Sequence, residues 1–231
     1  MAPPAHLAPG DTVNVPHEKS PLAALALYAL AMACVESALV VYLRDLYYPA
    51  DPRVLFPLVL LNHAHLGIEL LREFATLLMI GAVAWLAVRD AVRRFAAFVY
   101  VFGLWDIFYY AWLKAFIDWP VTWREWDVLF LIPWPWLGPW LAPVAIALVF
   151  VLWGGWALGA AQAPRFTWRE IALMLVGVSA MLVAFLAPAA PLVVRGPEAM
   201  TGYVPGAFAW ALFVPGWGVM TLALALARGR H

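Results

Sequence analysis

Apolar stretches alternate with short polar connections along most of the chain. Each stretch has roughly 20 residues, the length that an α-helix needs to cross the hydrocarbon core of a bilayer. The pattern therefore predicts about six membrane-spanning helices, at approximately residues 22–43, 62–88, 95–117, 141–160, 168–186 and 207–227. The expected fold is all-α, a polytopic transmembrane helix bundle.

Two of the connections are predicted to lie along the membrane surface. The apolar stretch from 54 to 88 is longer than one crossing requires, so residues 54–62 are expected to form a short interfacial helix. Between 118 and 140, six tryptophans alternate with prolines and a few charges. Because tryptophan favours the level of the lipid headgroups, this segment is predicted to be a short amphipathic helix before the fourth span.

The tetrapeptide Thr-Trp-Arg-Glu occurs at 122–125 and again at 167–170. In each copy a threonine able to cap a helix is followed by a glutamate that can reach back to it, which is the capping-box pattern. Helices are therefore expected to begin at both places.

The composition is that of a membrane protein. Hydrophobic residues make up 66% of the chain and charged residues 12%, with a mean hydropathy of +0.85, whereas soluble domains have about 45–50% and 25%. The lipid bilayer is the expected partner, and a formal net charge of zero gives no reason to expect a nucleic acid. The spans use most of the 231 residues, which predicts a flexible N-terminal tail at 1–21 and a single transmembrane domain at 22–231.

Lysine and arginine are distributed unequally between the two sides of this predicted bundle. Eight lie in the tails and connections on the side of the N-terminus, and five lie on the opposite side. Because cytoplasmic connections are enriched in these residues, both termini are predicted to be cytoplasmic, in a multi-pass protein of the cell membrane.

The second predicted span carries polar and charged side chains at steps of three and four residues. A charge at membrane depth costs about 2.5–3.5 kcal/mol on insertion scales, so such residues usually pair or line a cavity. This stripe is therefore the leading candidate for a functional site. With Glu73 flanking it, the stripe consists of Asn62, His65, Glu69, Arg72 and Thr76.

The alternating direction of the spans places further polar residues at a similar depth. Glu36 of the first span and Asp106 of the third are expected to meet the stripe in a cleft between the first three spans. The acidic side chains outnumber the basic ones, so they cannot all be ionised at once in a low dielectric. The predicted site residues are Glu36, His65, Glu69, Arg72, Glu73, Asp106, Tyr109 and Tyr110.

Three interpretations of this cleft are open. In the preferred one, the protein handles protons coupled to a small substrate or ion, with Glu69 and Glu73 as proton carriers and Arg72 as an anion partner or an internal counter-ion. Tyr109 and Tyr110 would be the hydrogen-bonding walls of this cleft. In the second, it is a membrane-embedded enzyme that depends on a divalent transition metal, although the Glu-x-x-His motif of di-iron bundles is missing. The metal ligands would then be Glu36, His65, Glu69, Glu73 and Asp106.

The third interpretation is structural. Arg72 would pair with Asp106 or Glu36 and hold helices together in a subunit of a membrane complex or in a homo-oligomer, since interhelical polar contacts are commonly packing devices. The sequence identifies no substrate and no reaction under any of the three interpretations.

The middle of the chain contains its most distinctive string, Phe-Gly-Leu-Trp-Asp-Ile-Phe-Tyr-Tyr at 102–110, followed by Leu-Phe-Leu-Ile-Pro at 129–133 and Trp-Leu-Ala-Pro at 140–143. These strings resemble a family of small bacterial multi-pass inner-membrane proteins of uncharacterised activity. The resemblance implies a bacterial inner-membrane protein and no particular chemistry, so no site residue is carried over from it.

Overall fold

A computed structural model describes residues 21–228 of the chain, so the predicted tail at 1–21 lies outside the described residues except for its last residue. Within them, six helices are long and apolar enough to cross a membrane, which confirms the all-α polytopic bundle. These helices are α1 (Leu22–Tyr47), α2 (His63–Ala87), α3 (Ala91–Ile117), α4 (Leu141–Gly159), α5 (Trp168–Leu186) and α7 (Trp210–Arg228).

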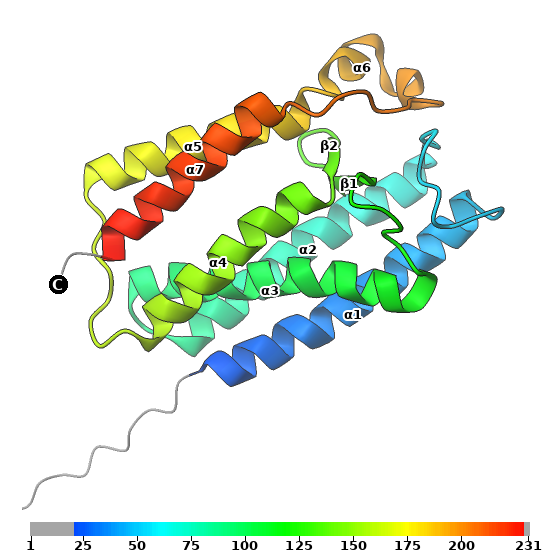
Figure 1. The fold of residues 1–231 in the computed structure, drawn as a ribbon. Helices are drawn as coiled ribbons and strands as arrows, with labels where there is room; N and C mark the ends of the chain where they lie inside the picture. The colour runs from blue at the N-terminus through cyan, green and yellow to red at the C-terminus, as the bar shows by residue number, and fades with distance from the viewer. Residues whose placement is uncertain (1–20, 229–231) are drawn as a thin grey trace, which may run out of the picture.

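Successive long helices run in opposite directions, so their connections alternate between the two ends of the bundle (Figure 1). The three long connections, 48–62, 118–140 and 187–209, lie at one end. The last of them contains the short helix α6 (Ala190–Arg195) and the 3-10 turn η1 (Pro197–Met200). The short connections, 88–90 and 160–167, lie at the opposite end.

α3 is the centre of one group of helices. α1, α2 and α4 each pack against α3, whereas α5 and α7 pack against each other as an antiparallel pair (Figure 1). Glycines allow the closest approaches between α3 and α4. A Cβ at Gly103 would lie 2.6 Å from the carbonyl oxygen of Ala147, and a Cβ at Gly154 would lie 2.7 Å from that of Ala96. Close packing of this kind is a main source of helix association in lipid.

Local sequence explains where several helices begin. The side chains of Asn62 and Asp90 accept hydrogen bonds from the backbone amides three residues later and so cap α2 and α3. At the start of α5 both halves of the predicted capping box are present. The side chain of Thr167 accepts from the amide of Glu170, and the side chain of Glu170 accepts from the amide of Thr167. The helix start predicted at Thr122 is wrong, because no helix follows it.

The tryptophan-rich segment before α4 is a β-hairpin, so the predicted amphipathic surface helix is wrong. β1 (Trp126–Phe130) pairs antiparallel with β2 (Trp136–Pro139). Four prolines lie between 120 and 139. Each lacks an amide hydrogen and disfavours the helical conformation of the preceding residue, while aromatic and branched side chains suit a strand.

The interfacial helix predicted at 54–62 is also wrong. This segment has no helical residue, and Pro57 interrupts it. Its backbone is held by the last long connection instead. The amide of Leu58 donates to the carbonyl of Tyr203 at 2.9 Å, and the amide of Gly202 donates to the carbonyl of Leu58 at 2.9 Å. The segment therefore forms part of a cover over one end of the bundle.

The α5–α7 pair provides a test of this helix packing. A Cβ at Gly216 would lie 2.8 Å from the carbonyl oxygen of Gly177 and 2.9 Å from the Cβ of Ala180, whereas a Cβ at Gly218 meets nothing within 4 Å. We expect Gly216→Ala to lower the free energy of unfolding by about 1–3 kcal/mol through overpacking, and Gly218→Ala to leave it unchanged or raise it. Thermal unfolding in detergent, followed by tryptophan fluorescence, measures both. Equal midpoints for the two variants would contradict the close approach.

Candidate functional site

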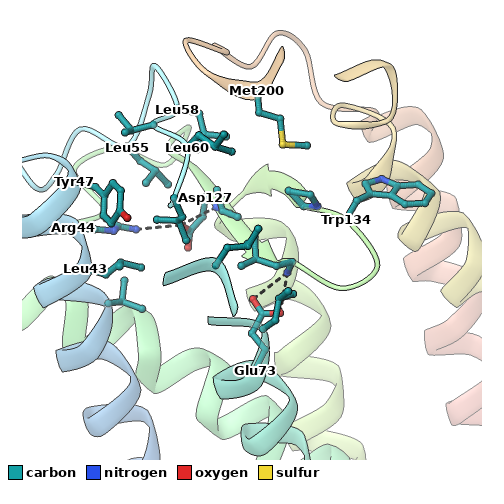
Figure 2. A pocket seen from close by; sticks show the side chains of 18 of the residues that line it. Leu43, Arg44, Tyr47, Leu55, Leu58, Leu60, Glu73, Asp127, Trp134 and Met200 are labelled. Atoms are coloured by element: carbon teal, nitrogen blue, oxygen red, sulfur yellow. Dashed lines mark hydrogen bonds and ion pairs between the residues drawn. The ribbon is translucent and has the colours of Figure 1, made fainter. Parts of the chain in front are cut away.

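A cavity of about 410 Å³ lies at the end of the bundle that carries the long connections. It lies between the ends of α1 and α2, and the segment 48–61, the β-hairpin, α6 and η1 complete its wall (Figure 2). Most of the lining is apolar and includes Leu43, Leu58, Leu60, Trp134 and Met200. The charged groups of its wall are Arg44, Arg72, Glu73 and Asp127.

A second, smaller cavity of about 40 Å³ lies deeper in the bundle. Arg72, Glu73 and Tyr109 line both cavities and therefore form the boundary between them. The volume is sufficient for a water molecule, because one needs only about 10–15 Å³ of space of this kind. The other residues around the small cavity are Glu36, Thr76, Trp105, Asp106 and Phe130.

Arg72 is held by two glutamates. Its Nε and Nη2 donate to Oε2 of Glu69 at 3.0 Å and 2.7 Å, and its Nη1 donates to Oε2 of Glu36. The hydroxyl of Thr76 donates to the other oxygen of Glu36 at 2.7 Å. Of the two partners that the sequence suggested for Arg72, the structure therefore pairs it with Glu36 and not with Asp106. The pair joins α1 to α2.

Glu73 and Asp106 have no ion-pair partner among the described residues. Both oxygens of Glu73 accept from the backbone amide of Leu131, at 3.0 Å and 2.9 Å, so a charge on this carboxyl is stabilised by one neutral donor. Figure 2 shows this contact at the base of the large cavity. Asp106 is only 9% exposed, and its Oδ2 is buried without a hydrogen-bond partner. Such an orphaned oxygen costs about 1–3 kcal/mol.

A second polar group, which the sequence did not reveal as part of the site, joins α1 to the β-hairpin. Nη2 of Arg44 lies 3.1 Å from Oδ1 of Asp127, and both side chains are only 4% exposed. The hydroxyl of Tyr110 donates to Oδ2 of Asp127 at 3.1 Å. The guanidinium of Arg44 also stacks 4.0 Å from the ring centre of Trp119. Burial raises the pKa of Asp127, and the charge of Arg44 opposes this shift.

Sequence reasoning missed Arg44 and Asp127 because each lies where a charge is expected at the headgroup level. Arg44 is in the last turn of the first span, and Asp127 follows a run of tryptophans. One signal was available, since Asp127 interrupts the apolar string from Trp126 to Phe130. Because an aspartate is almost never fully buried unless it is paired, a carboxylate within such a string indicates a buried partner.

The remaining predicted residues are only partly at the site. Glu69 contributes through its pair with Arg72, Tyr109 lines both cavities, and Tyr110 acts through Asp127. His65 lines neither cavity; its Nδ1 is hydrogen-bonded to the hydroxyl of Tyr47 at 2.8 Å, near the start of α2.

The donor set does not form a metal site in the described part of the chain. No group of three or more histidine, cysteine, aspartate or glutamate side chains there is arranged to hold a metal ion. The metal-dependent interpretation therefore receives no support from this geometry.

No protein-family model, curated protein or solved structure matches this chain significantly. The resemblance of residues 102–110 and the strings after them to a bacterial inner-membrane family thus stays an expectation, and the function must be argued from the site alone.

The Arg44–Asp127 pair can be tested against an exposed pair of the same kind. Asp127→Asn leaves Arg44 as an uncompensated buried charge, and we expect the free energy of unfolding to fall by about 3–5 kcal/mol. Asp51→Asn removes the partner of Arg53 on the surface, where screening by solvent should make the loss unmeasurable. Unfolding in mixed micelles measures both variants. If Asp127→Asn were as stable as Asp51→Asn, the pair would not hold the hairpin in place.

Proposed function

We propose that this protein binds a small, mostly apolar molecule in the 410 Å³ cavity and couples this binding to proton movement through Glu73 and Asp106. One observation carries the proposal: a mostly apolar cavity in a membrane protein ends at Glu73, a buried carboxyl without an ion-pair partner among the described residues, and a second such carboxyl, Asp106, lines the small cavity behind it. Pockets for small molecules typically have volumes of about 300–1,000 Å³, apolar walls and a few polar groups.

The position of the cavity favours a substrate that dissolves in the bilayer. α1 and α2 pack on α3 and make few contacts with each other, so the apolar space between their ends borders the lipid phase. Apolar burial contributes about 25 cal/mol per Å² of surface removed from water, which suits binding of an alkyl or aromatic body here. Following the distribution of lysine and arginine, we place this end of the bundle on the outer side of the membrane.

The order of the carboxyls favours proton handling. Glu73 borders both cavities, and Asp106 borders only the inner one. A proton that Glu73 takes up or releases when a substrate binds in the large cavity can therefore pass to or from Asp106 through a water molecule in the small cavity. Glu36 and Glu69 both form ion pairs with Arg72, so these two glutamates serve as its counter-ions and not as proton carriers.

A purely structural role has one observation in its favour. The pairs of Arg72 with Glu36 and of Arg44 with Asp127 join elements that are distant in sequence. That role explains neither the cavity nor the orphaned oxygen of Asp106. It remains the alternative against which the following experiments are designed.

Occupancy of the cavity is testable with adjacent residues of α2. Leu70 lines the cavity, whereas Leu71 is 67% exposed on the outside of the helix. We expect a photoreactive diazirine derivative of decanol to label cavity residues of the protein in nanodiscs, as mapped by peptide mass spectrometry. Leu70→Trp should reduce this labelling about tenfold by filling the space, and Leu71→Trp should leave it unchanged. Labelling confined to lipid-facing helix surfaces in every variant would contradict the proposal.

Proton exchange is testable by infrared difference spectroscopy of the reconstituted protein after a pH change. The carboxyl C=O stretch appears only in the protonated form, so Glu73→Gln and Asp106→Asn should each remove one signal from the wild-type spectrum. Asp45→Asn, at an exposed residue of α1 outside both cavities, should remove no buried-carboxyl signal. The structural role would be favoured if both variants lowered thermal stability but left the spectrum and the photolabelling unchanged.

A further inference from the structure

The two cavities are surrounded by more carboxyls than cations. Glu36, Glu69, Glu73, Asp106 and Asp127 are five acids that line the cavities or pair with residues that do, and Arg44 and Arg72 are the two bases. Both guanidiniums are engaged, Arg44 by Asp127 and Arg72 by Glu36 and Glu69. Of the three acids in excess, one shares Arg72 with the other glutamate of that pair, and the remaining two, Glu73 and Asp106, have no ion-pair partner among the described residues.

An isolated carboxylate in a low dielectric is strongly disfavoured, so such a group either keeps a proton or holds another cation. The two choices leave the total charge of the site the same. A proton and another cation can be exchanged at Glu73, because Glu73 borders the large cavity and Asp106 does not. Asp106 is 9% exposed, lines the inner cavity and has a buried oxygen without a hydrogen-bond partner, so the same requirement applies to it.

We propose that the substrate of the large cavity is a lipophilic cation, an alkyl or aryl compound with an ammonium group, which binds against Glu73 in exchange for a proton. This inference rests on the proposed function and specifies its substrate class. The carboxyl of Glu73 releases its proton to water as the cation enters, and the carboxylate that remains is the counter-ion. No covalent bond to the substrate forms or breaks.

The wall of the cavity has the chemistry that such a compound needs. Leucines and Met200 in the wall suit an apolar body, and the wall also contains the aromatic residues Tyr47, Trp134 and Tyr109, a residue type whose ring faces attract ammonium groups. An anion would add to the excess of negative charge. A bare metal ion would require a cluster of ligands that the described residues do not form. The unpartnered Nη1 of Arg44 does not call for an anion, because Asp127 already balances its charge.

The charge of Glu73 depends on all the groups that surround it. The charged and titratable groups on the packed elements are Glu36 and Arg44 of α1, Glu69 and Arg72 of α2, Asp106, Tyr109 and Tyr110 of α3, and Asp127 of β1. Among these carboxyls, only Glu73 and Asp106 lack a salt-bridge partner.

Three probes with the same alkyl chain separate charge from hydrophobicity: decyltrimethylammonium, decanol and decanoate. Each competes with the photoreactive decanol for the cavity of the full-length protein in phosphatidylcholine nanodiscs, with concentrations corrected for partition into protein-free nanodiscs. We expect decyltrimethylammonium to compete at a concentration about tenfold lower than decanol, and decanoate to be weaker than decanol. Because the quaternary ammonium carries no proton, about one proton per bound cation should appear in a weakly buffered solution containing a pH dye.

Glu73→Gln should abolish the proton release and bring decyltrimethylammonium to within about threefold of decanol, while decanol still competes. Asp45→Asn is the matched control and should behave as the wild type does. The comparison of the three probes uses the wild-type protein alone. It therefore tests whether the cavity prefers a cation even if Glu73→Gln fails to fold.

The outcomes separate this inference from the proposed function. If the three probes compete equally, or if the cation releases no proton, the substrate is not a lipophilic cation, although the cavity still binds apolar molecules. If the photoreactive decanol never labels the cavity, the proposed function itself is wrong.

Discussion

The ion pairs of Arg72 are the interaction on which the cavity depends. α1 and α2 pack on α3 and make few contacts with each other, so the guanidinium, bound by Glu36 of α1 and Glu69 of its own helix, is a main link between them. Moving the helices apart would leave buried charges uncompensated, which is strongly destabilising. Moving them together would crowd three long side chains. The distance between the helix ends is therefore held, and the cavity lies in the space that results.

Much of this arrangement follows from the pattern of the sequence. Hydropathy and helix length predict all six spans, because a bilayer demands long apolar helices whose backbone groups are satisfied internally. The steps of three and four residues on α2 place Glu69, Arg72 and Thr76 on one face. The alternating directions of the spans bring Glu36 and Asp106 to the same depth, where the structure places them around the small cavity. The periodicity could not say which carboxyl pairs with Arg72.

The connections were harder to predict, since their conformation depends on contacts with distant parts of the chain. A segment rich in tryptophan and proline suits the membrane interface as a helix or as a hairpin, and the prolines at 133 and 135 favour the hairpin seen here. Once formed, the hairpin brings Asp127 to Arg44 and the amide of Leu131 to Glu73. Both contacts span more than 50 residues of sequence, and no local pattern reveals them.

Asp106 differs from Asp127, the other buried aspartate near the cavities, in that one of its oxygens has no hydrogen-bond partner. A carboxyl that only holds helices together would have a partner for each buried oxygen, as Asp127 does through Arg44 and Tyr110. Asp106 has a buried oxygen without one. Since an unsatisfied buried polar atom lowers stability by about 1–3 kcal/mol, an apolar residue of similar volume would stabilise the fold more. A chain that keeps an aspartate here gives up stability, which is expected at sites where a side chain must gain and lose a proton or a ligand.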